Sequence, residues 1–241
     1  MPSPRILAFS SSKVGNGGYL ENAAPIIGNF LGNAPLTIAF IPFADVTLQY
    51  DGYAAKVKEG LAALGHTIET VLPQTAKKQI EKANVIMVGG GNTFKLLSLI
   101  YTSQVLDLVR DKVSAGIPYI GWSAGSNITG PTICTTNDMP IVEPKSFNAL
   151  GLFPFQINPH YYNVKPEGFN GETRDQRLTE FIVENPGIPV VCLPEGTALK
   201  FDNGVLQFIG QCPGILLHSL EDSTEIFRKE IAIGEDITRL M

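Results

Sequence analysis

The chain has 241 residues, 44% of them hydrophobic and 17% charged, which is the composition of a globular protein and excludes a disordered or fibrous one. Its formal net charge is −5 at pH 7, and no cluster of lysine and arginine gives it an electrostatic reason to bind nucleic acid or an anionic membrane. This length suits one large α/β domain, so we predict a single domain over residues 1–241 with a small molecule as its partner.

No segment of the sequence indicates export or insertion into a membrane. Residues 1–5 are not followed by the apolar stretch and small-residue cleavage site of a secretory signal, and no apolar run approaches membrane-spanning length. The three cysteines have no C-x-x-C spacing, which is typical of reduced thiols. We therefore predict a cytoplasmic protein.

Short β-rich runs alternate with helical patterns along the first half of the chain. The β-rich runs are residues 6–9, 37–41, 67–71, 85–88 and 119–120. Apolar residues recur at three- and four-residue spacing over 53–64 and 105–115, which predicts two helices. Such alternation implies crossover connections, and hence a mostly parallel central sheet covered by helices on both faces.

The second half of the chain is less regular. Residues 131–159 are rich in Pro, Asn and Thr without a clear period, and a long segment of this kind is often functional. A Thr-x-x-Gln capping box predicts a helix over 173–184, and the apolar residues 190–193 predict a buried strand. The tail over 198–233 alternates around an Asp-Asn-Gly turn, so we predict a small antiparallel C-terminal extension.

Residues 121–125, Gly-Trp-Ser-Ala-Gly, form the G-x-S-x-G pattern of a nucleophile elbow directly after the apolar run 117–120. The glycines let a strand turn sharply into a helix, which pushes the hydroxyl of Ser123 outward. The positive end of the following helix suits a developing oxyanion. Ser123 is therefore a candidate nucleophile, and the alternative is a plain turn between a strand and a helix.

A serine nucleophile needs a base, and the chain has three histidines. His66 follows a helix-to-strand turn and His218 lies in the apolar tail, so we expect structural roles for both. His160 lies between Pro159 and Tyr161 at the end of the irregular segment. His160 is therefore the candidate base.

Two carboxylates compete to orient that histidine. Asp138 lies in the irregular segment between the serine and the histidine, which gives the chain order Ser, Asp, His. Glu195 follows the strand predicted over 190–193, so it should emerge at the strand-end edge where the elbow lies. The strand argument favours Glu195, and Asp138 stays a candidate.

The run of residues 89–91 is Gly-Gly-Gly and precedes a helical pattern. It lacks the Lys-Ser/Thr ending of a P-loop and the spacing of a dinucleotide fingerprint. Beside an elbow, a backbone N–H near Gly91 and that of Ala124 could together form an oxyanion hole.

Seven stretches of this sequence match, in the right order, the motifs of a known family. They are residues 41–44, 89–94, 121–127, 135–140, 158–160, 171–177 and 193–196. On these residues the chain resembles peptidase E, the α-aspartyl dipeptidase family of serine peptidases, whose fold is akin to class I glutamine amidotransferases and flavodoxin. The tail after residue 198 shows no matching motif.

The resemblance implies an enzyme that cleaves dipeptides with a free N-terminal aspartate, Asp-X, without a metal or cofactor. Carried over by position, Ser123 is the nucleophile and His160 the base, while Asp138 and Glu195 still compete for the acid. The family likeness also implies that Arg174 binds the side chain of the substrate's aspartate, since a guanidinium pairs with a carboxylate through two charge-assisted bonds. We expect a monomer or a homodimer that binds neither nucleic acid nor membrane.

Two alternatives remain open. One is a related acyl or β-aspartyl peptide hydrolase of the cyanophycinase kind. The other is a catalytically silent binding protein on the same scaffold, whose signature would be the loss of Ser123 or His160, and both residues are present.

Overall fold

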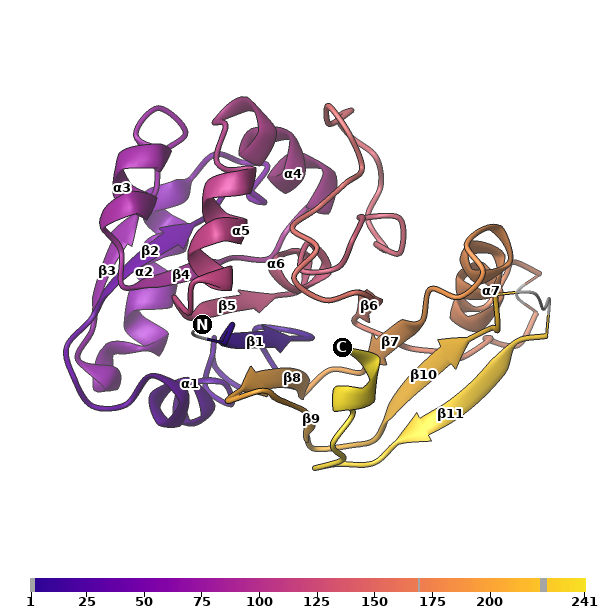
Figure 1. The fold of residues 1–241 in the computed structure, drawn as a ribbon. Coiled ribbons are helices and arrows are strands. Elements are labelled where there is room, and N and C mark those ends of the chain that lie inside the picture. Colours follow the sequence, from indigo (N-terminus) through magenta and orange to yellow (C-terminus); the bar gives the residue numbers. More distant parts are fainter. Residues whose placement is uncertain (1–2, 169, 222–224) are drawn as a thin grey trace.

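A computed structural model describes residues 3–168, 170–221 and 225–241 (Figure 1). In this part of the chain the larger sheet has seven strands in the order β3-β2-β4-β5-β1-β8-β9. The strands are β1 (Ile6–Phe9), β2 (Thr37–Ile41), β3 (Thr67–Thr70), β4 (Val85–Val88), β5 (Tyr119–Trp122), β8 (Thr197–Asp202) and β9 (Val205–Gly210). The first five are parallel, whereas β8 and β9 run antiparallel at one edge. The predicted α/β fold with a mostly parallel sheet is confirmed.

Helices cover both faces of this sheet. They are α1 (Ala24–Leu31), α2 (Tyr50–Gly60), α3 (Ala76–Lys82), α4 (Thr93–Thr102), α5 (Leu106–Ser114) and the short α6 (Ala124–Asn127), with a 3-10 turn η1 (Ala62–Leu64) after α2. Neighbouring residues of a strand point to opposite faces. In β2, Phe40 packs in a buried cluster with Ile27 of α1 and Val57 of α2, while Ile41 packs on the other face with Ile80 of α3. Burial on both faces explains why these strands are continuous apolar runs.

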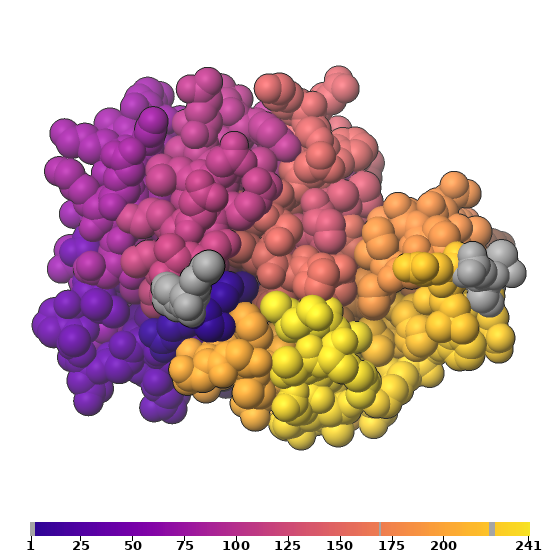
Figure 2. Space-filling model, in the orientation of Figure 1, coloured from indigo at the N-terminus to yellow at the C-terminus, as the bar shows by residue number. Residues whose placement is uncertain are grey.

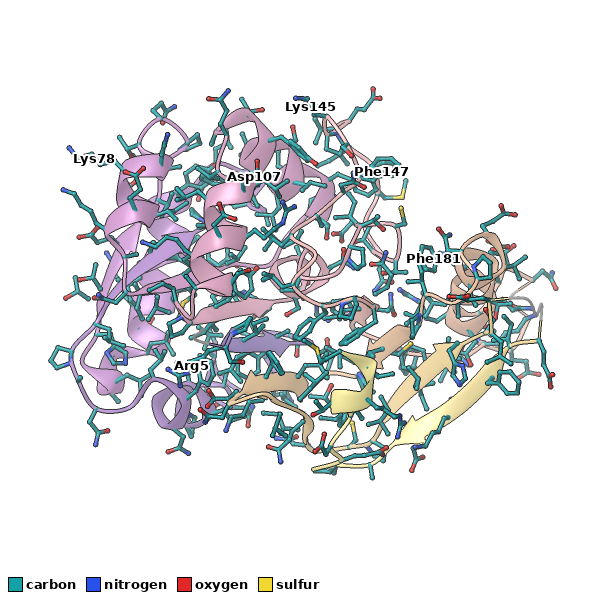
Figure 3. The ribbon with its side chains drawn as sticks, in the orientation of Figure 1. Arg5, Lys78, Asp107, Lys145, Phe147 and Phe181 are labelled. Atoms are coloured by element: carbon teal, nitrogen blue, oxygen red, sulfur yellow. The ribbon has the colours of Figure 1, made fainter. Side chains whose placement is uncertain are left out.

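The helices are amphipathic, with their charged residues outward. In α3, Ile80 is buried and Lys78 is exposed, and in α5, Val109 is buried and Asp107 is exposed (Figure 3). The longest described helices, α2 and α7 (Arg174–Glu184), have 11 residues each. Within the described ranges, no helix is long and apolar enough to cross a membrane.

A second sheet carries the C-terminal part of the chain, which projects from the side of the larger body (Figure 2). Its four described strands have the order β11-β10-β7-β6. They are β6 (Gln156–Pro159), β7 (Val190–Leu193), β10 (Gly214–His218) and β11 (Phe227–Ile231). Helix α7 packs on this sheet through Leu178 and Ile182, which form a buried cluster with Val190 and Ile215. The predicted capping box of α7 is present, since Thr173 and Gln176 exchange both of its hydrogen bonds.

The strands of the C-terminal tail are antiparallel, as predicted, and they divide between the two sheets. The first two tail strands form a hairpin on the edge of the large sheet, through a turn with positive φ at Asn203 and Gly204. The next two strands, β10 and β11, join β7 and β6 in the second sheet. Alternating hydrophobicity predicts a strand but does not say which strand it pairs with.

One prediction needs correction. Residues 131–159 are not irregular throughout, because they end in the buried strand β6. The single domain over 1–241 stays a prediction.

Candidate active site

Ser123 lies at the sharp turn between β5 and α6. Its backbone has φ 53° and ψ −115°, a region that a residue with a side chain rarely adopts. Two glycines make the turn possible. A Cβ atom on Gly121 would lie 2.5 Å from the carbonyl oxygen of Gly125, and one on Gly125 would collide with the carbonyl oxygen of Val88. The structure thus has the strand–turn–helix geometry that the G-x-S-x-G pattern predicts.

The imidazole of His160 lies beside this serine. Its Nε2 is 2.9 Å from the Oγ of Ser123, and its Nδ1 is 3.0 Å from the Oε1 of Glu195. When Nδ1 carries its proton toward the carboxylate, the lone pair of Nε2 faces the serine hydroxyl. The ring is partly open to solvent, as is the side chain of Glu195. The three side chains therefore form a row from hydroxyl to imidazole to carboxylate.

Glu195 and His160 meet because β6 and β7 are parallel neighbours. Asn158 pairs with Cys192 and Pro159 with Leu193, so His160 and Glu195 leave the same end of adjacent strands. Glu195 thus lies at a strand end near the elbow, as predicted. That strand belongs to the second sheet, yet its end faces the elbow of the first.

Asp138 does not contact His160. Its Oδ2 accepts hydrogen bonds from the N–H of Thr93 at 2.7 Å, from the hydroxyl of Thr93 at 2.6 Å and from the hydroxyl of Thr136 at 3.2 Å. This carboxylate therefore lies at the N-terminus of α4, where a negative charge is favourable. It also lines a small cavity of about 30 Å³ together with Ser123 and His160. Of the two competing carboxylates, the structure brings Glu195 to the imidazole and holds Asp138 against α4.

Ser10 is a further residue of the site, and no pattern in the sequence predicts it. It directly follows β1, is fully buried, and its hydroxyl accepts a hydrogen bond from the backbone N–H of His160 at 2.9 Å. The same hydroxyl donates to the carbonyl oxygen of Leu193 at 2.7 Å. His160 itself has a positive φ of 51°. No sequence motif marks Ser10, because its importance lies in two contacts with distant parts of the chain.

The glycine run passes directly beside the nucleophile candidate. A Cβ atom on Gly90 would lie 2.9 Å from the Cβ of Ser123, and one on Gly91, whose φ is 136°, would collide with the carbonyl oxygen of Ala44. Among the described residues, the backbone N–H groups of Gly91 and Ala124 have no hydrogen-bond acceptor. Two free donors suit an oxyanion hole, which stays a prediction.

A cavity of about 860 Å³ opens at Ser123. His160, Gly91 and Trp122 contribute to its lining, and so do Lys13 and Lys56 from other parts of the chain. This volume lies in the range of pockets that take small ligands, and a dipeptide fits it. Within the described ranges, no group of three His, Cys, Asp or Glu side chains could hold a metal ion.

Arg174 lies outside this cavity. It is the first residue of α7 and has Tyr161, Cys192 and Arg177 as electrostatic neighbours. Burial, and to a lesser extent the like charge of Arg177, lowers the pKa of the Arg174 guanidinium. Among the described residues it has no ion-pair partner. The structure does not bring Arg174 to Ser123, and its contact with substrate stays a prediction.

The other two histidines lie away from the cavity. His218 stacks on Phe227 with a centroid distance of 5.2 Å, and both ring nitrogens of His66 are buried without a hydrogen-bond partner among the described residues. Neither ring touches a residue of the serine–histidine–glutamate row.

An α/β scaffold that presents a serine, a histidine and a carboxylate in such a row defines the class of serine hydrolases. The model of peptidase family S51 matches residues 6–209, which is most of the chain. The chain belongs to peptidase family S51 and is a serine peptidase.

Similar proteins cover nearly the whole chain. Peptidase E of Shewanella denitrificans is 48% identical over 233 residues, which are 96% of this chain and 97% of that protein. Peptidase E of Haemophilus influenzae is 49% identical over 208 residues, 86% of this chain and 95% of that protein. The crystal structure of a peptidase from an acI-B1 actinobacterium superposes with a TM-score of 0.67 at 17% identity, covering 98% of this chain and 96% of that one. At that identity the last match supports the fold alone.

Proposed function

We propose that this peptidase hydrolyses dipeptides with a free N-terminal aspartate through an aspartyl-enzyme intermediate. The observation that carries the proposal is the row of Ser123, His160 and Glu195 at a cavity large enough for a dipeptide. The high identity to proteins named peptidase E supports the choice of substrate.

Acylation begins at the serine hydroxyl. His160 takes the proton of Ser123 through Nε2, and the resulting alkoxide attacks the carbonyl carbon of the aspartyl residue. Glu195 keeps the proton of the imidazole on Nδ1 and stabilises the imidazolium that forms. The backbone N–H groups of Gly91 and Ala124 donate to the oxyanion of the tetrahedral intermediate.

The intermediate collapses when His160 passes its proton to the leaving amine. The C–N bond breaks, the second residue of the dipeptide departs, and the aspartyl group stays on Ser123 as an ester. Water then enters, gives a proton to His160 and attacks the ester carbonyl, which releases aspartate and restores the serine hydroxyl.

Asp138 and Arg174 have supporting roles in this proposal. Asp138 holds the start of α4, and with it the glycine run that precedes this helix. Arg174 binds the side-chain carboxylate of the substrate's aspartate. Its half-buried guanidinium, without an ion-pair partner among the described residues, supports that role, since an unpaired buried charge favours binding of a counter-ion.

A panel of four substrates tests the proposal. Asp-Leu, Glu-Leu, β-Asp-Leu and N-acetyl-Asp-Leu differ in one feature each, and we expect the purified enzyme to cleave Asp-Leu in strong preference. A higher kcat/KM for β-Asp-Leu would identify a β-aspartyl hydrolase instead. Absence of labelling by a serine-directed fluorophosphonate, with no cleavage of the panel, would identify a silent binding protein.

A further inference from the structure

Two ammonium groups line the cavity at Ser123 without an assigned role. Lys13 comes from the loop between β1 and α1, and Lys56 comes from α2. Both side chains are exposed, and neither forms an ion pair with a described residue. The acidic residue of the described lining is Asp45.

The carboxylate of Asp45 is hydrogen-bonded to residues of its own loop. Its Oδ1 accepts hydrogen bonds from the N–H of Thr47 at 3.0 Å and from the hydroxyl of Thr47 at 2.7 Å, and its Oδ2 accepts from the N–H of Gln49 at 2.9 Å. Each oxygen of this carboxylate thus has a partner next to the start of α2. With two ammonium groups against this one carboxylate, the described lining carries an excess of positive charge in a chain whose net charge is −5.

The backbone that carries Lys56 is tied to the glycine run. Tyr53, three residues earlier on the same face of α2, donates its hydroxyl to the carbonyl oxygen of Gly90 at 3.0 Å. The same hydroxyl accepts a hydrogen bond from the Nε1 of Trp122 at 3.1 Å. Burial raises the pKa of Tyr53 well above its ordinary value, so the hydroxyl keeps its proton. The backbone of Lys56 therefore lies at a fixed place relative to Ser123, and its exposed side chain extends from there.

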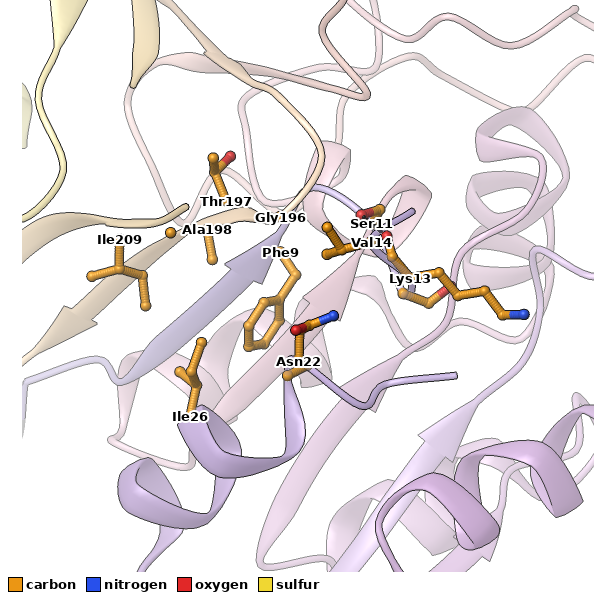
Figure 4. Close-up of a pocket in the computed structure, with 13 residues that line it drawn as sticks. Phe9, Ser11, Lys13, Val14, Asn22, Ile26, Gly196, Thr197, Ala198 and Ile209 are labelled. Carbon is orange, nitrogen blue, oxygen red and sulfur yellow. Dashed lines mark hydrogen bonds between the residues drawn. The ribbon is translucent and has the colours of Figure 1, made fainter. Parts of the chain in front are cut away.

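The loop that carries Lys13 packs against the residue that follows Glu195. Figure 4 shows a small cavity at this turn, where Val14 lies beside Gly196 and the side chain of Lys13 extends away from the apolar residues. A Cβ atom on Gly196 would lie 3.3 Å from the Cγ1 of Val14. The hydroxyl of Ser11 donates to the carbonyl oxygen of Lys13 at 2.6 Å, which orders the loop from within.

An Asp-X dipeptide carries two carboxylates, one on each side of the bond that breaks. The carboxylate of the leaving residue is present in a dipeptide and absent, at that position, from a longer peptide or an amide. We propose that Lys13 and Lys56 form a subsite for the C-terminal carboxylate of the leaving residue, and that this subsite restricts the enzyme to dipeptides. The inference rests on the proposed Asp-X activity. Because an ammonium is a compact charge on a flexible stem, such a subsite accommodates leaving residues of different size.

The test compares two substrates that differ in this carboxylate, Asp-Leu and Asp-Leu-amide. The variants are Lys13→Gln, Lys56→Gln and the pair combined, with Lys56→Arg as the variant that keeps the charge. For Asp-Leu, each single change should raise KM by about tenfold with little change in kcat, the cost of one hydrogen bond to a charged group. For Asp-Leu-amide, the kinetic constants should stay within about twofold, since the amide lacks the charge that the lysines bind.

Lys58 supplies the matched control. It is exposed on the same helix but does not line the cavity. Lys58→Gln changes the net charge by the same amount, and it should leave both substrates unaffected. Lys56→Arg should keep most of the affinity for Asp-Leu.

Two results would overturn the subsite. An equal loss for Asp-Leu and Asp-Leu-amide would assign the lysines to the aspartyl side of the substrate, and no loss for either would remove them from substrate binding. If the wild-type enzyme cleaves neither compound, this result contradicts the proposed function and leaves the subsite to be tested by binding. Calorimetric binding of Asp-Leu and Asp-Leu-amide to Ser123→Ala, with and without the lysine changes, then decides the subsite without turnover.

Discussion

The hydroxyl of Ser10 accepts a hydrogen bond from the backbone N–H of His160 at 2.9 Å, and this contact joins the two sheets at the active site. Ser10 directly follows β1 of the large sheet, and the neighbouring strand β5 ends just before Ser123. His160 follows β6 of the second sheet, and Leu193, the other partner of this hydroxyl, ends β7. One buried side chain thus sets the base against the nucleophile.

Removal of this hydroxyl should harm catalysis more than binding. In Ser10→Ala the N–H of His160 and the carbonyl of Leu193 lose their buried partner, which costs about 1–3 kcal/mol of stability. A shift of the imidazole by a fraction of an ångström should lower kcat by up to about 100-fold with KM little changed. Steady-state kinetics and thermal unfolding measure the two effects.

Thr129→Val is the control for Ser10→Ala. The hydroxyl of Thr129 is also buried, and it donates to the carbonyl oxygen of Ser126 at 2.6 Å without touching the row of site residues. This variant should lose stability while it keeps kcat. An equal loss of kcat in both variants would mean that Ser10 acts through stability alone.

The two carboxylates should respond differently to neutral, isosteric changes. Glu195→Gln replaces the carboxylate opposite Nδ1 of His160 with a neutral amide. The amide no longer stabilises the imidazolium, and its NH2 group can donate to Nδ1 and favour the wrong tautomer, so kcat should fall by roughly 10²–10⁴-fold. Asp138→Asn keeps an oxygen for Thr93 and removes a charge at the start of α4, which costs about 1 kcal/mol of stability and little activity. The reverse outcome, a larger loss of kcat in Asp138→Asn, would return Asp138 to the acid role.

The glycine run should not tolerate a side chain at its second position. In Gly90→Ala the new methyl group would lie 2.9 Å from the Cβ of Ser123, so either the loop or the nucleophile must shift. We expect kcat to fall by about 100-fold, because the oxyanion donors move with the loop. Gly52 lies on a helix and lines the same cavity, and nothing lies within 4 Å of a Cβ added there. Gly52→Ala should gain up to about 1 kcal/mol of stability and lower kcat far less than Gly90→Ala does. A normal kcat in Gly90→Ala would separate the glycine run from catalysis.

Arg174 lies outside the cavity, so its proposed role needs its own measurement. If it binds the aspartyl side chain, Arg174→Met should lower kcat/KM for Asp-Leu by about 30-fold or more, the equivalent of about 2 kcal/mol. Arg177→Met is the comparison. This neighbour is exposed on the same helix, and its Nε lies 3.7 Å from the Oε2 of Glu172. Its replacement should change kcat/KM by less than about twofold. Equal effects of the two changes would leave Arg174 without a specific role.

A structural feature of this protein can be predicted from the sequence when the residues that determine it are close together in the chain. The bounds of β1, β2, β4 and β7 are predicted correctly, because strands buried on both faces are continuous apolar runs. Strand β6 was missed, since its residues Gln-Ile-Asn-Pro carry no β pattern although all four are buried. The partners of the tail strands could not be predicted because pairing is set by distant segments.

The site follows the same rule. The elbow at Ser123 is a local pattern of five residues and could be found directly, and His160 emerged by elimination among three histidines. Ser10 could not be found. The residues that its hydroxyl bonds lie 150 and 183 positions away in the chain, and only the folded structure brings them together.

The activity of Ser123→Ala on Asp-Leu tests the central claim most directly, with circular dichroism to show that the variant folds. Loss of the hydroxyl removes the group that forms the aspartyl ester, so we expect kcat to fall by at least about 10⁴-fold. A variant that is folded and keeps kcat within about tenfold of the wild type would contradict the account.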